Sequence, residues 1–354
     1  MKNLSKNTKS SLTTYGMVVA AYIICELFLQ TGHMTSLLKG LLVPLCVYAI
    51  LAVSLNLTVG ILGELSLGHA GFMCVGAFSS AIFSKCMMNT ITVPTVRFLL
   101  ALLIGVVCAG ICGVLIGIPV LRLRGDYLAI VTLAFGEIIK NLVNVIYLGK
   151  DSAGFHFSMK DIMSLNMEAD GDVIIKGAQG ITGAPTDSNF TIGIILLLIT
   201  LFVVMNLVNS RSGRAIMAIR DNRIAAESIG INITKYKILA FSISAALAGA
   251  AGVLYAHNLS TLTALPKNFG YNMSITILVF VVLGGIGNIR GSVIAAVVLT
   301  LLPELLRFLS DYRMMIYAVV LIVTMILVWS PGGIAFRERL ENMNPFRKKE
   351  KEVQ

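Results

Sequence analysis

Residues 98–121 read FLLALLIGVVCAGICGVLIGIPVL and contain no charged side chain. A bilayer core about 30 Å thick is crossed by roughly 20 apolar residues in a helix, so this stretch predicts a membrane-spanning helix. Small residues stand at every fourth position along one face of it: Gly105, Ala109, Gly113 and Gly117. A later apolar run repeats the pattern with Ser244, Ala248, Gly252 and Ala256. Small faces let helices approach closely in lipid, so we expect a compact helical bundle.

The composition of the whole chain agrees with this prediction. Of 354 residues, 56% are hydrophobic and 13% are charged, whereas soluble domains carry about 25% charged residues. This balance excludes a cytosolic enzyme, a disulfide-stapled secreted module and a disordered chain. Nine further apolar runs predict spans at residues 15–29, 38–59, 66–84, 127–148, 191–208, 238–256, 273–287, 292–309 and 314–330. The predicted fold class is an all-α integral membrane protein, a polytopic helical bundle with about ten transmembrane helices.

The distribution of basic residues predicts the orientation of the bundle. Lysines and arginines favour cytoplasmic segments, and an N-in/C-in arrangement places eighteen of the 28 on the cytoplasmic side. The predicted parts are a cytoplasmic N-tail (1–14), a membrane domain (15–335) and a basic cytoplasmic C-tail (336–354). Within the membrane domain we expect an extracytoplasmic loop at 149–190 and a cytoplasmic loop at 209–237. The net charge of +10 lies between apolar segments, so nucleic acid is not an expected partner.

Two glycine-rich stretches predict interruptions of the helices. They are LSLGHAGF at residues 65–72 and GGIGNIRG at 284–291. Irregular backbone persists inside a membrane only where protein or a water-filled cavity satisfies it, and broken helices often flank a transport path. The region 273–309 is therefore either two spans or a reentrant element. The residues that we predict along a translocation path are Gly68, His69, Gly71, Thr132 and Glu137.

Each of the ionisable residues in this set also has a structural interpretation. Glu137 and Lys140 lie three residues apart on one helix and can pair with each other. His69 follows a glycine where a helix can begin, so it can cap or bridge helices. The six cysteines and four histidines show no metal-ligand spacing, and we predict no metal site.

The cytoplasmic segment 212–230 predicts a short helix outside the membrane. Ser212 is suited to cap its start and Gly230 to stop its end. Small and apolar residues fall on one side of this helix, and charged residues on the other. This combination favours docking in the groove of a partner protein over lying on an anionic membrane.

Four stretches together resemble one family. They are LSLGHAGF (65–72), RLRGDYLAIVTLAFGEI (122–138), the segment from Arg214 to Tyr236, and VLGGIGNIRG (282–291). The chain resembles the M-type membrane-spanning permease subunits of ATP-driven branched-chain amino acid importers. In that family an Ala-Ala-x-x-x-Gly core docks on the ATPase, and Ala225, Ala226 and Gly230 match it. The general importer motif has a glutamate before the alanines, whereas this chain has Ile224.

The resemblance implies a non-enzymatic subunit that works with partners. It implies a second permease subunit, two cytoplasmic ATPase subunits, an extracytoplasmic solute-binding protein and a bacterial plasma membrane. The chain lacks G-x-x-x-x-G-K-[ST], so ATP is expected on the partner subunits and no cofactor on this chain. The predicted ATPase-coupling residues are Arg214, Arg220, Asp221, Ala225, Ala226, Glu227 and Gly230. The alternatives are the same role in an importer of urea or short amides, and a self-sufficient secondary carrier.

Overall fold

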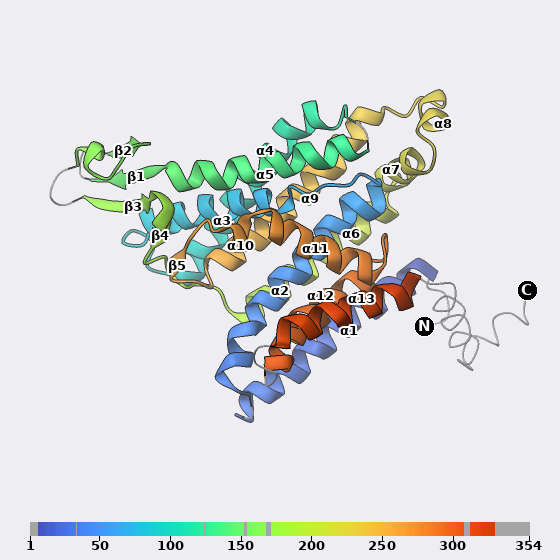
Figure 1. Ribbon diagram of the computed structural model, residues 1–354, viewed down its shortest axis with the longest axis horizontal. Coiled ribbons are helices and arrows are strands. Elements are labelled where there is room, and N and C mark those ends of the chain that lie inside the picture. Colours follow the sequence, from blue (N-terminus) through green and yellow to red (C-terminus); the bar gives the residue numbers. More distant parts are fainter. Residues whose placement is uncertain are drawn as a thin grey trace, which may run out of the picture. The chain divides into compact units, whose positions relative to one another are not determined.

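The structure is a computed structural model that describes residues 6–32, 34–123, 125–151, 154–167, 171–307 and 312–329 (Figure 1). The chain forms two compact units, residues 1–296 and 297–354. The predicted C-tail and the first five residues of the predicted N-tail lie outside the described residues.

Long helices account for each of the ten predicted spans. They are α1 (Lys6–Gln30), α2 (Ser36–Asn56), α3 (His69–Cys86), α4 (Pro94–Val120), α5 (Asp126–Val145), α6 (Phe190–Asn209), α9 (Ile233–Ala256), α11 (Tyr271–Gly284), α12 (Ile289–Leu305) and α13 (Arg313–Trp329). Within the described residues, seven helical stretches are long and apolar enough to cross a membrane. α3, α12 and α13 are outside that set. The chain is therefore a helical membrane protein.

Helix α9 lies at the centre of the first unit and packs against α2, α3 and α4. Its contact with α4 depends on the small residues of both helices. A Cβ atom on Gly113 would lie 2.6 Å from Cβ of Ala245, closer than two carbon atoms can pack. On the α3 side, a Cβ atom on Gly252 would overlap the carbonyl oxygen of Met73. The predicted close approach of small helix faces is confirmed.

The opposite face of α4 is apolar and exposed. Its exposed side chains include Leu99, Leu103, Ile111, Leu115 and Ile118. A continuous row of large exposed apolar side chains is unusual on a soluble monomer. It suits a helix that faces lipid or another membrane subunit.

Both predicted interruptions of the helices are present. An irregular stretch precedes α3, which begins at His69. The second stretch separates α11 from α12, and it contains Gly285 and Gly287 at φ of 94° and 82°. A further irregularity was not predicted: α2 continues as a π-helix, η1 (Leu57–Leu62), which ends at the left-handed Gly63.

The prediction of an all-α chain was wrong for the loop predicted at 149–190. Strands β1 (Tyr147–Lys150), β2 (Phe155–Ser158) and β3 (Asp172–Lys176) form an antiparallel sheet in the order β2-β1-β3. Strand β4 (Ile181–Thr182) pairs with β5 (Thr261–Leu262). Two short 3-10 turns, η2 (Met163–Leu165) and η3 (Gly177–Gln179), interrupt the loop. Strands β1 and β2 form a local hairpin of short segments, whereas β3 and β5 pair with strands that lie further away in the sequence.

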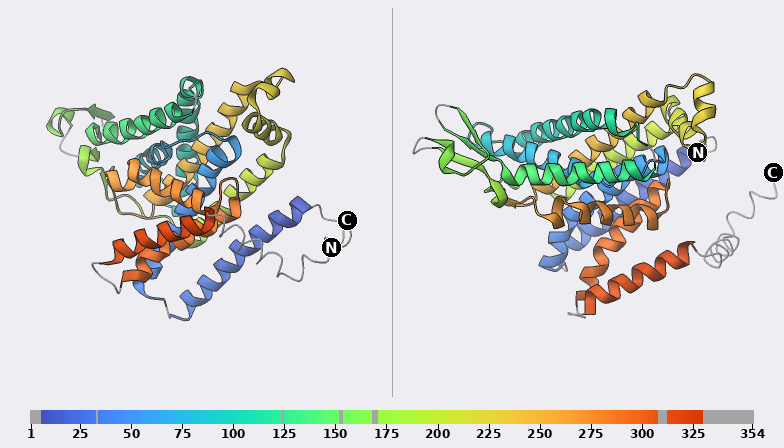
Figure 2. Two further views of the ribbon diagram at one scale, coloured as in Figure 1. Left: turned by 45° about the vertical axis from the view of Figure 1, so that its right-hand side comes forward. Right: turned by 45° about the horizontal axis from the view of Figure 1, so that its top comes forward.

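The short helices α7 (Arg211–Asp221) and α8 (Arg223–Ser228) lie at the other end of the first unit from these strands. Both views of Figure 2 keep this separation. Helix α10 (Pro266–Phe269) leads into α11. The β4–β5 pair places the loops after α5 and α9 at one end of the bundle, and α7 packs on η1 at the opposite end.

Candidate functional site

The predicted helix at 212–230 is two helices, α7 and α8, separated at Asn222. Asn222 adopts an extended backbone, and its side chain accepts a hydrogen bond from the amide of Ala225 at 3.0 Å. An asparagine that caps the second helix in this way ends the first. The start is also corrected, because Ser210 rather than Ser212 caps α7 through the amide of Gly213. Gly230, at φ of 85°, follows the end of α8 as predicted.

Apolar contacts hold this helical pair against the bundle. Ile216 belongs to a buried cluster with Leu57, Ile61 and Leu62 of η1. Ile219 and Ala226 form a second cluster with Ile233, at the start of α9. The pair is therefore attached to the end of α2 and to the start of α9.

The outer surface of α8 is apolar at its two ends. Ile224 is 81% exposed and Ile229 is 75% exposed. Ala225, Glu227 and Gly230 are also exposed. Ala226 is 2% exposed and faces inward, so it positions α8 and does not contact a partner in this conformation. Ile224 and Ile229 offer more contact area than the two alanines that the sequence motif emphasises.

The three charged residues predicted on α7 are exposed at this end of the bundle. Arg214 donates to the carbonyl of Asn209 at 3.1 Å. Arg220 donates to the carbonyl of Gly60 at 2.8 Å and pairs with Asp221 at 3.0 Å. The Arg220–Gly60 hydrogen bond connects α7 directly to the π-helix.

Three of the predicted path residues form a close crossing of α3 and α5. A Cβ atom on Gly68 would overlap the carbonyl oxygen of Thr132, and one on Gly71 would lie 2.7 Å from Cα of Gly136. Thr132 accepts a hydrogen bond from the amide of Leu67 at 3.0 Å. In this conformation these residues join two helices, and a role in a path stays a prediction.

His69 and Glu137 have the structural partners that the sequence suggested as alternatives. His69 is buried, and its Nε2 lies 2.7 Å from Oγ of Ser54 on α2. Ser54 Oγ donates to the carbonyl of Leu51, so Nε2 is the donor to Ser54. Glu137 pairs with Lys140, and it accepts a hydrogen bond at 2.8 Å from the amide of Tyr271, which begins α11.

A set of buried polar contacts around the end of α2 was not predicted from the sequence. Asn56 accepts from the amide of Gly287 at 2.9 Å and donates to Ser292 at 2.8 Å. Thr58 donates to Ser244 on α9 at 2.8 Å, and Ser244 donates to the carbonyl of Ser54. The contact of Asn56 with Gly287 satisfies one amide of the irregular backbone between α11 and α12, as burial in a membrane requires. Single serines and asparagines in apolar runs gave no pattern to predict them.

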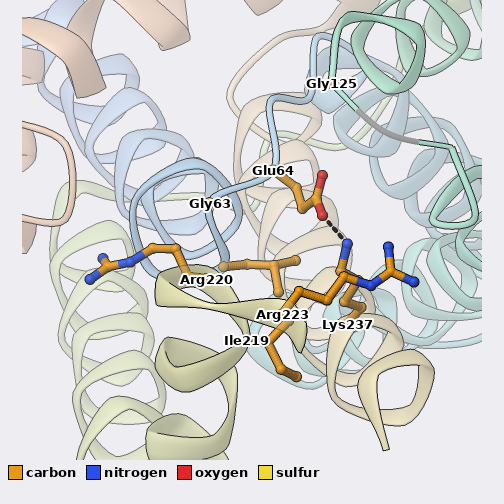
Figure 3. A pocket seen from close by; sticks show the side chains of 8 residues that line it. Gly63, Glu64, Gly125, Ile219, Arg220, Arg223 and Lys237 are labelled. Atoms are coloured by element: carbon orange, nitrogen blue, oxygen red, sulfur yellow. Dashed lines mark hydrogen bonds and ion pairs between the residues drawn. The ribbon is translucent and has the colours of Figure 1, made fainter. Parts of the chain in front are cut away.

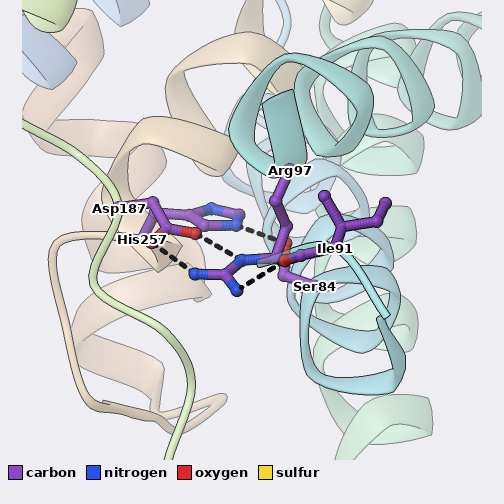
Figure 4. Close-up of polar contacts among 5 residues, drawn as sticks. All are labelled: Ser84, Ile91, Arg97, Asp187 and His257. Carbon is purple, nitrogen blue, oxygen red and sulfur yellow. Dashed lines mark hydrogen bonds and ion pairs between the residues drawn. The ribbon is translucent and has the colours of Figure 1, made fainter. Parts of the chain in front are cut away.

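A further buried cluster lies at the strand end of the bundle (Figure 4). Arg97, at the start of α4, makes two hydrogen bonds of 2.7 Å to the carboxylate of Asp187. His257, directly after α9, donates from Nδ1 to the carbonyl of Val253, so its Nε2 accepts from Ser84 at 2.7 Å. Burial lowers the pKa of His257 below its ordinary 6.5, which keeps the ring neutral beside Arg97. The cluster ties α3, α4, α9 and the segment before α6 together.

The described residues contain no group of three or more histidine, cysteine or acidic side chains arranged to hold a metal ion. The features described in this subsection are contacts between helices and the exposed side chains of α7 and α8.

Comparison with known proteins gives the family. Residues 37–328 match the model of the branched-chain amino acid transport system permease component. The chain belongs to this family. It is 34% identical over 297 residues to the high-affinity branched-chain amino acid transport system permease protein LivM of Salmonella typhimurium, which covers 81% of this chain and 67% of the relative.

More distant relatives include both named permease types of such systems. The probable permease protein LivM of Methanocaldococcus jannaschii is 24% identical, across 81% of this chain and 90% of the relative. The permease protein LivH of Escherichia coli K12 is 24% identical, across 84% of this chain and 93% of the relative. No solved structure matches the chain. The permease family found here agrees with the resemblance carried by the four sequence stretches.

Proposed function

We propose that this chain is one of two permease subunits of an ATP-binding-cassette importer for branched-chain amino acids in a bacterial plasma membrane. The observation that carries the proposal is the exposed apolar surface of α8, fixed to α2 and α9 in a chain of this permease family. Large exposed apolar side chains beside charged ones are typical of a protein docking surface.

Coupling to separate ATPase subunits follows from this surface. An ATPase subunit that moves Ile224 and Ile229 moves α8, and Ala226 carries the movement to the start of α9. The Arg220–Gly60 hydrogen bond carries it to the end of α2. Substrate then passes between this chain and a second permease subunit, after delivery by a solute-binding protein at the strand end. That relatives are named both LivM and LivH supports a pair of different permeases.

The topology in this proposal has ten spans with both termini in the cytoplasm. The positions of the ten long helices support this number. One end of the first unit contains η1, Gly125, α7, α8 and the start of α9. This shared location supports our assignment of these segments to the same, cytoplasmic side of the membrane. An odd number of spans between any two of these segments would place them on opposite sides of the membrane.

The test of coupling uses Ile224→Glu. A buried charge at the docking surface should reduce co-purification of the ATPase by about tenfold or more, while the chain still inserts in the membrane. Met163→Glu is the control, because Met163 is 88% exposed at the other end of the bundle. Normal ATPase recovery with Ile224→Glu would contradict the assignment. Ala226→Glu is unsuitable, because it would disrupt the buried cluster itself.

The substrate is tested on the accompanying binding protein. Titration with leucine, isoleucine, valine and urea should give binding of the three amino acids and none of urea. Binding of urea alone would assign the chain to an amide importer. Uptake by the chain alone, reconstituted without ATP, would instead support a secondary carrier.

A further inference from the structure

A cavity of about 220 Å³ lies between the start of α8 and the ends of several long helices (Figure 3). Its polar lining comes from Glu64, Arg223 and Lys237, and Gly63 and Gly125 contribute backbone. The buried side chains of Leu62 and Ile219 add apolar surface. Of the lining residues, Ile219 and Arg220 also take part in the contacts described above, whereas Glu64, Arg223 and Lys237 do not.

The cavity lies at the ends of three candidate spans. Leu62 is the last residue of the candidate span Ser36–Leu62, and Gly125 directly precedes the span Asp126–Val145. Lys237 is in the first turns of the span Ile233–Ala256. Helix ends at this boundary are surrounded by lipid headgroups.

The charges in the cavity leave one cation without a partner. Lys237 pairs with Glu64, and both side chains are largely buried. The Arg220 guanidinium points away in Figure 3, toward its own partners, the Gly60 carbonyl and Asp221. Arg223 lies beside Lys237, and among the described residues it has no hydrogen-bond or ion-pair partner. A planar guanidinium beside an ammonium group matches the geometry of a phosphate group.

We propose that this cavity binds the phosphate group of an anionic phospholipid. Arg223 donates two hydrogen bonds to the phosphate oxygens, and the ammonium group of Lys237 donates a further one while it stays paired with Glu64. Leu62 and Ile219 contact the apolar part of the lipid next to the headgroup, which a free phosphate ion would leave uncovered. Because Arg223 begins α8, the lipid binds between the docking helix and the bundle.

The experiment measures lipid retained by the purified full-length chain, using native mass spectrometry after addition of dioleoyl phosphatidylglycerol. The unaltered chain should retain one lipid, and Arg223→Gln should lower its apparent affinity by about tenfold or more, as loss of a charge-assisted contact predicts. Lys235→Gln is the matched control. Lys235 is an exposed basic residue at the same membrane boundary that does not line the cavity, so its substitution should leave retention unchanged.

Two further binding measurements distinguish a phospholipid headgroup from a free phosphate ion. Dioleoyl phosphatidylcholine, whose headgroup has no net charge, should bind more weakly at this site. Displacement of the phospholipid by millimolar inorganic phosphate would overturn the proposal in favour of a free-ion site. Equal retention by the Arg223→Gln and Lys235→Gln chains would overturn it as well. Because the readout is lipid binding, it does not depend on transport or on ATPase docking.

Discussion

The pair Arg97–Asp187 is a buried ion pair at the strand end of the bundle. Its two hydrogen bonds join a helix start to a segment 90 residues away, and the side chains are only 7% and 6% exposed. Breaking a buried ion pair by removing one charge leaves the other charge without compensation. This pair therefore fixes the segment before α6 to the bundle.

At this residue scale we predict the effect of Asp187→Asn. It should lower the free energy of unfolding by about 3–5 kcal/mol, because Arg97 would stay buried without a carboxylate. Thermal unfolding of the chain in lipid discs measures the effect. Asp172→Asn is the control, because Asp172 is 71% exposed in its pair with Lys85 and its loss should cost no more than about 1 kcal/mol. Equal destabilisation by both variants would refute the argument.

Some contacts of single residues could be predicted from the sequence, and others could not. Glu137 and Lys140 were predicted as a pair from their spacing along one helix, and the structure confirms the pair. The inward position of Ala226 was not predicted, because the break at Asn222 rotates α8 relative to a continuous helix. Asn56 could not be recognised, because its partners are more than 200 residues away in sequence.

At the scale of elements, close packing of α4 on α9 depends on which glycines face the contact. Gly113 faces Ala245, whereas Gly110 has only an ordinary contact, 3.5 Å from its Cβ position to Ala246. The spacing of four along α4 predicted this face correctly. Which face of α9 meets α4 was not predicted, since Gly252 in the repeated pattern packs on α3 instead.

We predict that Gly113→Ala destabilises the chain by about 1–3 kcal/mol, because the added methyl group forces the helices apart. Gly110→Ala, one turn away on the same helix, should be neutral or slightly stabilising, because alanine is the better helix former. Chemical or thermal unfolding of both variants in the same lipid provides the comparison. A loss of stability with Gly110→Ala that matches Gly113→Ala would show that helix contact is not the cause.

At the scale of the whole molecule, length and hydropathy located the long helices, because a membrane requires uninterrupted apolar runs. The strands between α5 and α6 were not predicted, because they are short and lie in a polar segment, and because β3 and β4 pair with strands that are distant in sequence. The orientation rests on the distribution of basic residues, and it is tested directly by labelling.

We expect a cysteine in place of Met163 to react with a membrane-impermeant maleimide in intact cells. A cysteine in place of Ile224 should react only after the membrane is permeabilised, because α8, which contains Ile224, lies at the opposite end of the first unit from β2 and β3, which flank Met163. Both substitutions are made in a chain whose six native cysteines have been replaced. The reverse pattern of labelling would invert the topology, and labelling of both sites in intact cells would refute it.

The length and unbroken course of α9 allow it to transmit movement from one end of the first unit to the other. It begins next to α8 and ends next to His257, and its 24 residues contain no proline. At 1.5 Å per residue it is a rod about 36 Å long. A tilt of about 5° applied at one end would displace the other by about 3 Å, a simple lever-arm estimate from that length. The same helix joins the proposed docking surface to the buried cluster of Arg97 and Asp187, so a force applied at one end of α9 is transmitted directly to its other end.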